Sequence, residues 1–464
     1  MKRTYEELEA ELATTQTELA SIQKLLKQAL DEIAKLKEQI KCNSKNSSKS
    51  PSTDQKGNTP DKDKKERATR TGKARPLFPS ERIDRHIACT QDNCPHCGSG
   101  LIQLSNHPAE VLHQAELPEV KAVVTEYQLL KYQCNGCGKN STAGLPAGIP
   151  DSAFGPKLMG LIATLTGVFH LAKREAIQLI KELYGVDMSV GSIPNIEERV
   201  TKALDPIYQR VYNFVIESKC CKHFDETGWR DSGKRHFAWI ASCSEAAFYR
   251  IDRERSSAAF QRLIRQCPKK FTAVTDRYAV YNPIGVHQYS LAHLIRDFKK
   301  YAERDGPDKE IGEALVQELK TVCHIHGEYR TGKIEVQQRN RQLGRHKRKV
   351  QTWLEDGMAN GSDQLYRLSE TLLDDFDKLW AFTKNAGMEP TNNMAERDLR
   401  KLVIWRKKSY GTRSARGQRF VERITTVAQT ARKRGKDVLG LIQEALTKFY
   451  AGVMPHDIFE ALKV

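Results

Sequence analysis

Apolar residues between positions 5 and 40 recur with the seven-residue period of a coiled coil. Two series, offset by three residues, make up this stripe: Tyr5, Leu12, Leu19, Leu26, Ile33 and Ile40, and Leu8, Thr15, Ile22, Ala29 and Leu36. A stripe with this period must be buried against another helix. Because five heptads exceed an ordinary globular helix, the pattern favours a coiled coil over residues 1–40 and a homo-oligomer. An amphipathic helix packed on its own protein is the alternative.

The apolar pattern disappears between residues 41 and 80. Ser, Asn, Thr, Pro and Lys replace it, for example over 43–54, and such a composition cannot bury enough surface to fold by itself. Residues 41–75 contain 11 Lys or Arg against 4 Asp or Glu. The segment is therefore predicted to be a basic disordered linker, which either adds nonspecific phosphate contacts or is simply solvated.

Two C-x-x-C-G motifs stand out in residues 81–150, with the strand-like segment 120–130 between them. Each motif turns tightly enough for two thiolates to share one tetrahedral ion, and the Gly after it tolerates the backbone angles of that turn. The spacing predicts a zinc-binding ribbon, and reduced, unligated thiols are the alternative. Four thiolates close the shell of a zinc ion, so the expected role of Zn²⁺ is structural. The four ligands would be Cys94, Cys97, Cys134 and Cys137.

Residues 151–215 have the pattern of packed helices. An amphipathic segment over 171–184 is followed by a turn at Gly185 and by a second, Ser-capped segment over 189–200. This order resembles a helix-turn-helix, whose second helix enters the major groove of DNA. Plain packing of a helical hairpin is the alternative, because Pro194 lies within the second segment.

Short apolar segments separated by turns predict a sheet in the next part of the chain. Three of them suggest an antiparallel meander: 220–229, 235–243 and 247–251. A helix over 256–266 and a fourth strand within 270–282 follow. This is the strand order of an RNase H-like sheet, in which the first and fourth strands lie side by side at the centre. The predicted fold class is therefore multidomain α/β with an RNase H-like core.

Two aspartates mark this central pair of strands. Asp225 and Asp276 lie where the first and fourth strands give way to polar residues, so they are expected to face each other. Carboxylates so placed repel and are tolerated when a cation lies between them. Mg²⁺, or Mn²⁺, is the cation that polarises a scissile phosphate and activates a water or a 3′ hydroxyl. A third carboxylate is expected from a later helix, and Glu396 is the best candidate because Asn392 and Ala395 suit a helix start. Each acid taken singly is better explained as a solvated strand or helix end, and only their combination favours a metal site.

The motifs together resemble the IS66 family of transposases. The resemblance covers nearly the whole chain and is carried by the heptads, the cysteine pairs and five segments: 46–54, 224–228, 275–282, 291–296 and 392–400. It implies a DDE catalytic triad on Asp225, Asp276 and Glu396, within an RNase H-like fold that a helical insertion interrupts. It also implies that small accessory proteins of the same element take part.

Three places depart from the family pattern. Thr391 precedes Asn392 and Asn393 where the family commonly has Asp, and Arg277 follows the second aspartate where Gly is common. Residues 290–296 lack the usual Cys or Trp and the paired arginines. The triad itself is intact.

The core is expected in two parts, 216–298 and 381–464, with the charged helical insertion over 299–380 between them. The insertion contains the basic segment 337–349, which either tracks DNA or is solvated. His293 and Arg296 are expected to begin the helix after the fifth strand, near the acids. There they would contact a scissile phosphate or the leaving oxygen, unless they are ordinary helix-surface residues.

The charge balance points to a polyanionic partner. The 464 residues contain 75 Lys or Arg against 58 Asp or Glu, a net charge of +17 and a pI near 9.3, which suits nucleic acid. Between Arg397 and Lys436, 14 Lys or Arg accompany only two acids. A line of cations beside the proposed metal site predicts phosphate contacts, a solvated basic face being the alternative. The candidates are Arg397, Arg400, Arg406, Lys407, Lys408, Arg413 and Arg416.

These features predict a transposase that binds the terminal inverted repeats of an insertion sequence, cuts DNA with Mg²⁺ and joins the 3′ ends to target DNA. The coiled coil would pair two protomers. The chain has no run of eighteen apolar residues and no apolar leader, which predicts a cytoplasmic, nucleoid-associated bacterial protein with no membrane partner. The alternatives are a noncatalytic DNA-binding protein derived from a transposase, and a metal-dependent nuclease without strand transfer.

Overall fold

The computed structural model describes residues 15–19, 21–22, 25, 76–103 and 110–460. The described residues among 15–25 are helical, but most of the predicted coiled coil and the linker up to residue 75 lie outside the described residues. The chain divides into two compact units, Met1–Asn58 with Val124–Val464, and Thr59–Val123.

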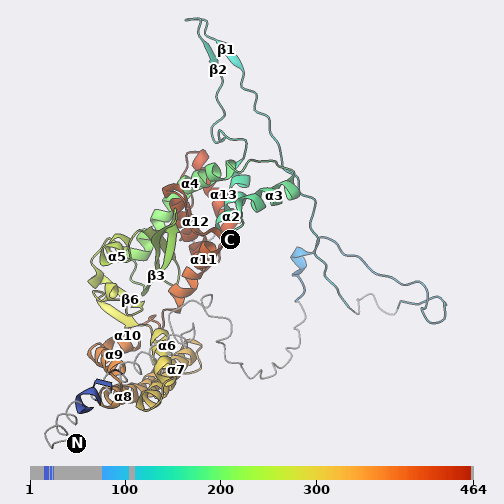
Figure 1. The fold of residues 1–464 in the computed structure, drawn as a ribbon. Coiled ribbons are helices and arrows are strands. Elements are labelled where there is room, and N and C mark those ends of the chain that lie inside the picture. The colour runs from blue at the N-terminus through green and yellow to red at the C-terminus, as the bar shows by residue number, and fades with distance from the viewer. Residues whose placement is uncertain (1–14, 20, 23–24, 26–75, 104–109, 461–464) are drawn as a thin grey trace, which may run out of the picture. The chain divides into compact units, whose positions relative to one another are not determined.

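A five-stranded mixed sheet forms the centre of the larger unit (Figure 1). Its strands are β3 (Lys222–Asp231), β4 (Lys234–Ser242), β5 (Ala247–Asp252), β6 (Thr272–Thr275) and β7 (Val286–Tyr289), in the order β5-β4-β3-β6-β7. The first three strands pair antiparallel, and β6 and β7 run parallel to β3. The predicted meander and the central pairing of the first and fourth strands are confirmed, and the topology is consistent with an RNase H-like core.

Seven helices of the described ranges pack around this sheet, directly or through other helices. They are α2 (Pro156–Gly167), α3 (Lys173–Tyr184), α4 (Ser192–Glu217), α5 (Ser257–Ile264), α11 (Asn393–Ser409), α12 (Ala415–Lys433) and α13 (Val438–Tyr450). Helices α2 and α13 pack on α4 and α12, and α3 packs on α2. Helices α4, α11 and α12 contact strands β3 to β5, and α5 contacts β4. The helices before the sheet, which the sequence pattern places in a separate domain, share one apolar core with it, through residues such as Val200, Val211 and Ile240.

Helices α3 and α4 have the predicted helix-turn-helix order. Pro194 is the third residue of α4, where it is tolerated because the first N–H groups of a helix have no partner within the helix. However, α4 is 26 residues long and its apolar face is buried in the core. Its first turns present Glu197 and Glu198, which pair with Lys173 (3.2 Å) and Arg416 (3.1 Å). These contacts favour packing of α4 within the protein over its insertion into a DNA groove. DNA binding by this pair of helices stays a prediction.

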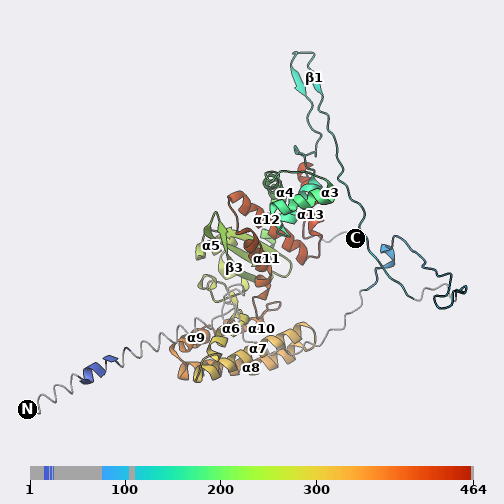
Figure 2. The ribbon, with the colours of Figure 1, turned by 45° about the vertical axis from the view of Figure 1, so that its right-hand side comes forward.

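The insertion is a helical layer with its own core. Its helices are α6 (Leu291–Ala302), α7 (Pro307–Arg330), α8 (Val336–Asn360), α9 (Asp363–Asp374) and α10 (Phe376–Lys384). Leu294, Leu315, Leu343 and Trp380 are among its buried residues, and α7 and α8 lie side by side (Figure 2). The insertion therefore begins directly after β7 and ends before α11. No helix in the described ranges has the length and apolar character needed to cross a bilayer.

Each C-x-x-C-G motif folds into the expected tight turn. The N–H of Gly98 donates to the carbonyl of Cys94 (2.9 Å), and that of Gly138 donates to Cys134 (2.8 Å). Both glycines have positive φ, 75° and 68°, which is why Gly follows the second cysteine. The second turn joins β1 (Lys131–Gln133) to β2 (Asn140–Thr142). The strand-like segment 120–130 is not a strand: β1 begins only at residue 131, and Leu130, at the end of the segment, accepts the backbone N–H of Ala143 (2.9 Å).

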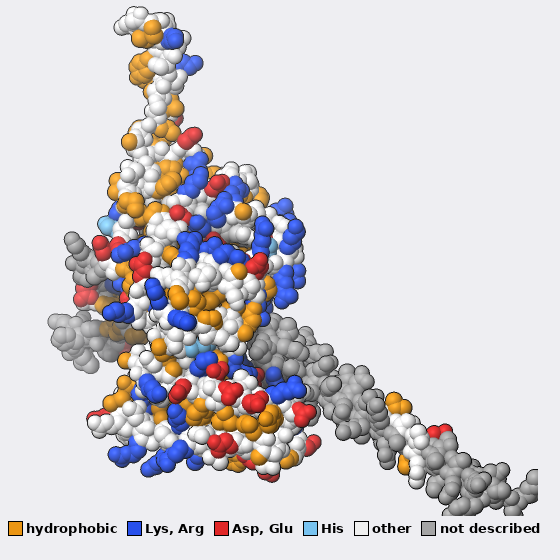
Figure 3. Space-filling view, turned by 90° about the vertical axis from the view of Figure 1, so that its left-hand side faces the viewer, with side chains coloured by type: hydrophobic (Ala, Val, Ile, Leu, Met, Phe, Trp, Pro, Cys, Tyr) orange, Lys and Arg blue, Asp and Glu red, His pale blue; other side chains and the backbone are white. Residues whose placement is uncertain are grey.

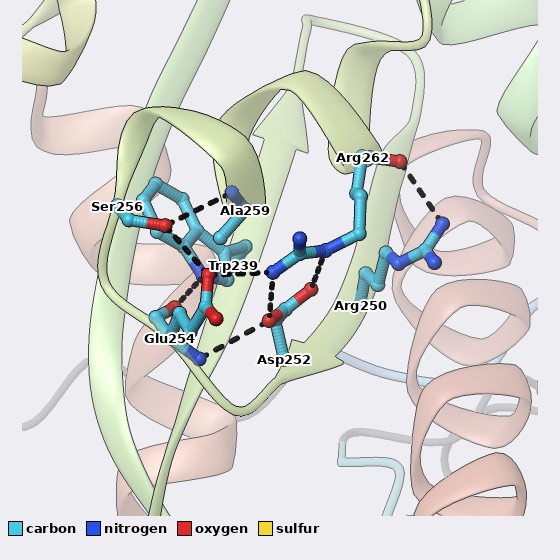
Figure 4. Close-up of polar contacts among 7 residues, drawn as sticks. All are labelled: Trp239, Arg250, Asp252, Glu254, Ser256, Ala259 and Arg262. Atoms are coloured by element: carbon cyan, nitrogen blue, oxygen red, sulfur yellow. Dashed lines mark hydrogen bonds and ion pairs between the residues drawn. The ribbon is translucent and has the colours of Figure 1, made fainter.

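The loop between β5 and α5 is braced by ion pairs (Figure 4). Arg262 binds both Asp252 (2.8 Å) and Glu254 (3.0 Å), and the indole N–H of Trp239 donates to the carbonyl of Glu254 (3.1 Å). Ser256 caps α5 by accepting from the N–H of Ala259 (3.3 Å). These contacts define the path of residues 252–256, and with it the place of Arg255 beside the site described next.

Candidate catalytic site

The parallel pairing of β3 and β6 brings the two aspartates together. His223 pairs with Val274, and the same register continued by two residues sets Asp225 opposite Asp276. Asp276 directly follows the end of β6, as predicted. Asp225 was expected at a strand end, and this is wrong: it is the fourth residue of β3, which continues to Asp231 because it pairs with β4 over its whole length.

Burial and mutual repulsion dominate the electrostatics of this pair. Burial, followed by the charges of Glu226 and Asp276, raises the pKa of Asp225 well above its usual range. Burial also raises the pKa of Asp276, against the opposing effects of the Tyr278 N–H and of nearby arginines. A raised carboxylate pKa means that the charged form is disfavoured where it stands. A divalent cation bound between the two aspartates would therefore stabilise their charged forms.

Glu396 reaches the same region from the first turn of α11. Its carboxylate pairs with Arg296 (3.2 Å) and lies 3.4 Å from the Nε2 atom of His293, both on α6. Its charge contributes to the raised pKa of Asp225. The structure therefore gathers the three predicted acids and the two predicted α6 residues, which come from four separate elements.

The aspartates suit a divalent cation. Each accepts one backbone N–H, Asp225 from Glu226 (2.8 Å) and Asp276 from Tyr278 (3.0 Å), and neither has a salt bridge to a described residue. Both are only half-buried, and their free carboxylate oxygens are the hard ligands that Mg²⁺ prefers. In the described ranges, no three His, Cys, Asp or Glu side chains already form a metal-holding group; Glu396 is held by Arg296 instead.

Glu226 is a further acid of the site that sequence reasoning missed. Successive side chains of a strand point to opposite faces, so Glu226 points away from Asp225, toward Tyr281 and Arg255. It accepts from the Tyr281 hydroxyl and pairs with Arg255 at 2.6 Å, and its side chain is only 2% exposed. The available signal was a second acid directly after Asp225.

Asn392 connects the elements that carry the acids. Its Nδ2 atom donates to the carbonyl of Phe224 (2.8 Å), its Oδ1 atom lies 3.1 Å from Nδ1 of His223, and its N–H donates to Ser290 Oγ (3.0 Å). The residue is fully buried. It therefore ties the start of α11 to β3 and to the start of α6. The sequence placed Asn392 at a helix start but did not reveal this network.

One departure from the family pattern has a structural partner. Arg277, which follows Asp276, pairs with Asp297 of α6 at 2.7 Å. This ion pair joins the loop after β6 to the helix that carries His293 and Arg296. Arg277 therefore stabilises the position of this loop against α6.

The predicted phosphate-binding cations divide into two groups. Arg406 is half-buried and donates to the carbonyl of Gly228, which favours a role in packing α11 on β3 over a phosphate contact. Arg416 is paired with Glu198. The others are exposed: Arg397, Arg400, Lys407, Lys408 and Arg413. On the face drawn in Figure 3, Lys and Arg side chains gather on the part of the larger unit above the insertion.

Two histidines outside the carboxylate cluster, the half-buried His170 and the buried His287, predict acid sensitivity. Burial, then Lys408 and other cations, lowers the pKa of His170 to about 4, and burial, then Lys378, lowers that of His287 to about 4. Unfolding restores a pKa near 6.5, so the unfolded state binds more protons between about pH 6.5 and 4. Stability therefore falls as pH falls through this window.

We expect the free energy of unfolding to drop by about 2–4 kcal/mol between pH 7 and pH 4.5, measured by urea titration. His287→Gln should flatten this dependence, and His324→Gln, at an exposed site, should not. Equal pH slopes in all three proteins would contradict the assignment.

Comparison with known families agrees with this geometry. Residues 151–420, more than half of the chain, match the DDE transposase domain described as the transposase IS66 family, and residues 91–138 match the zinc-finger binding domain of transposase IS66. Residues 2–81 match a family of unknown function (DUF6444). No curated protein matches the chain.

The fold and the matched domain define a transposase of the DDE class, a class whose chemistry implies a divalent metal. Within that class, the chain belongs to the IS66 family. The predicted family is thereby confirmed.

Proposed function

We propose that this protein cuts DNA at the ends of an insertion sequence and transfers the freed 3′ ends to target DNA. The observation that carries the proposal is the approach of Asp225, Asp276 and Glu396 beside Arg296. Membership of a transposase family supports the same reaction. The surface beside the site is rich in exposed cations, as a DNA substrate requires.

In this proposal Asp225 and Asp276 hold the metal, and Glu396 completes the site. A bound Mg²⁺ or Mn²⁺ would supply charge stabilisation at the phosphate and a deprotonated attacking oxygen. Arg296 would release Glu396 and bind a phosphate oxygen of the DNA. Burial, then Arg296 and Arg277, lowers the pKa of His293 to about 3, so its ring is neutral at pH 7 and suited to accept or donate a hydrogen bond near the leaving oxygen.

The four cysteines of the two tight turns are proposed to bind one structural Zn²⁺. All four lie within the segment that matches the IS66 zinc-finger domain. Hydrogen bonds from Ser99, backbone first, lower the pKa of Cys97, and those from Cys137 and Gly136 lower the pKa of Cys134. Lower thiol pKa values favour the thiolate form that a metal requires.

We expect one zinc ion per chain in the purified protein. Cys137→Ser should lower the zinc content to near zero, and Cys267→Ser, at another exposed cysteine, should leave it at one. Elemental analysis, together with a thiolate-sensitive colorimetric assay, measures the zinc content of both variants. Full zinc content in the Cys137 variant would exclude this ligand set.

The remaining parts of the proposal concern assembly. The heptads of residues 1–40 would pair protomers so that two terminal inverted repeats meet in one complex, and small accessory proteins of the element would assist. The protein would act on the bacterial nucleoid in the cytoplasm. The helix pair α3–α4 and the basic linker would add DNA contacts.

The test is strand cleavage of a labelled element-end duplex, with the protein and Mg²⁺ or with EDTA. We expect cleavage only with the metal, and joined products when a 3′-hydroxyl donor and a supercoiled target are supplied. Cleavage without joining would identify a nuclease. Specific binding without cleavage, even with the neighbouring open reading frames co-expressed, would identify a noncatalytic DNA-binding protein.

A further inference from the structure

One face of α11 is a row of unpaired cations. Five of its exposed positions are basic, namely Arg397, Arg400, Lys401, Lys407 and Lys408, and the exposed Ile404 lies between Lys401 and Lys407. Among the described residues none of them forms an ion pair, whereas Arg406 of the same helix is bound to Gly228. The positive potential of this row extends to His170, where Lys408 and Lys401 help to lower the pKa. A polyanion is the complementary partner.

Tyr410 ends this row. It is the C-cap residue of α11, with φ 59° and ψ 17°, and it is 82% exposed. Left-handed backbone is unfavourable for a bulky residue. Within the described part of the chain, its ring makes no aromatic or cation contact and its hydroxyl makes no hydrogen bond. Exposure of an unpaired ring on a strained residue has no explanation in the packing of this chain.

The loop that follows keeps Tyr410 in place. A Cβ atom on Gly411 would lie 2.1 Å from the carbonyl oxygen of Arg230, so only Gly fits. Thr412 is joined to the β3–β4 hairpin by backbone hydrogen bonds with Arg230 (2.9 Å) and Ser232 (2.8 Å), and its hydroxyl accepts from the Trp229 indole (3.2 Å). The backbone that carries the ring is therefore anchored to the sheet. Because this backbone is already ordered, it loses little conformational entropy when a ligand binds the ring.

We propose that Tyr410 is a stacking platform for an unpaired nucleobase of DNA whose backbone follows the basic face of α11. Aromatic rings in a basic setting are the usual platforms for single-stranded DNA, because every base has a π-face. Fourteen residues separate Tyr410 from Glu396, which is about 21 Å along a helix. At 3.4 Å per nucleotide, the stacked base lies about six nucleotides from the carboxylates, so Tyr410 binds DNA without touching the scissile phosphate. This role rests on the proposed action on DNA.

The experiment measures binding and stacking rather than cleavage. The full-length protein is titrated, with EDTA present, into a twenty-nucleotide single strand carrying one 2-aminopurine and into the corresponding blunt duplex. Fluorescence anisotropy gives the affinity, and 2-aminopurine quenching reports stacking. The variants are Tyr410→Ala, Tyr410→Phe, which keeps the ring, and Lys407→Gln, which removes a phosphate contact. Unchanged melting temperatures establish that the variants are folded.

We expect Tyr410→Ala to weaken single-strand binding about ten-fold and to abolish quenching, with duplex binding and the salt slope unchanged. Tyr410→Phe should behave as the native protein. Lys407→Gln should weaken both DNAs and reduce the salt slope by about one. Unchanged single-strand affinity and quenching in Tyr410→Ala, or equal losses for both DNAs, would overturn the proposal. The transposase proposal fails independently: absence of metal-dependent cleavage, with base stacking on Tyr410 still observed, would contradict that proposal and leave the stacking role intact.

Discussion

Replacing Asp225 by Asn should abolish strand cleavage and at the same time make the metal-free protein more stable. The carboxylate is proposed to hold the catalytic metal, whose contribution is several kcal/mol, so cleavage should fall by at least about a thousand-fold. DNA binding should persist because the exposed cations of α11 are unchanged. The variant is nearly isosteric, and it keeps an oxygen that can accept from the Glu226 N–H.

The gain in stability follows from the raised pKa of Asp225. Burial, Glu226 and Asp276 all disfavour its charged form, so removing the charge should raise the melting temperature by about 2 °C. The sign of the pH dependence follows from this shift: the charge destabilises the fold fully above the raised folded-state pKa, and the effect shrinks as pH falls below that value and is absent below the ordinary carboxyl pKa. The stability difference between the two proteins should therefore shrink on acidification.

Cleavage of the labelled duplex with Mg²⁺ and differential scanning calorimetry with EDTA measure the two effects. Asp305→Asn is the matched control, because Asp305 is exposed in the loop between α6 and α7, and it should change neither quantity. Native cleavage by the Asp225 variant would exclude this residue as a metal ligand.

Asn392→Ala should reduce both stability and cleavage. The substitution leaves the buried carbonyl of Phe224 and the ring of His223 without their partners, at a cost of about 2–4 kcal/mol in the free energy of unfolding. It also frees the start of α11 from β3. Because misplacement by about 1 Å can cost about a hundred-fold in rate, cleavage should fall by about that factor, although Asn392 is expected to touch neither metal nor DNA.

Neighbouring residues supply the controls. Asn393→Ala changes an exposed residue of the same type and should leave stability and cleavage close to native. Ser290→Ala removes only the acceptor of the Asn392 N–H and should give an intermediate loss of about 1 kcal/mol. This variant keeps the test usable if Asn392→Ala does not fold. Native cleavage in both variants would show that the network does not position Glu396.

Much of the core was predictable because it depends on local patterns and on a known strand order. The meander and the Gly-ended cysteine turns follow from short-range periodicity and spacing, and the place of β6 beside β3 follows from the known strand order. The errors arose where tertiary packing overrides a local pattern. Residues 120–130 have a strand-like sequence but form no strand, and Asp225 lies inside its strand because β4 pairs with β3 from His223 to Asp231.

By itself the sequence determined the family and the basic character of the chain, since these depend only on residue types and their spacing, and it predicted the three acids. Only the tertiary structure decided which cations are free, since Arg406 and Lys407 are adjacent in sequence but one binds Gly228 and the other faces solvent. It also decided the partners of Asn392, which lies 168 residues from Phe224, and of Glu226. Hydrogen bonds between distant segments depend on how elements pack, and no local period in the sequence encodes that.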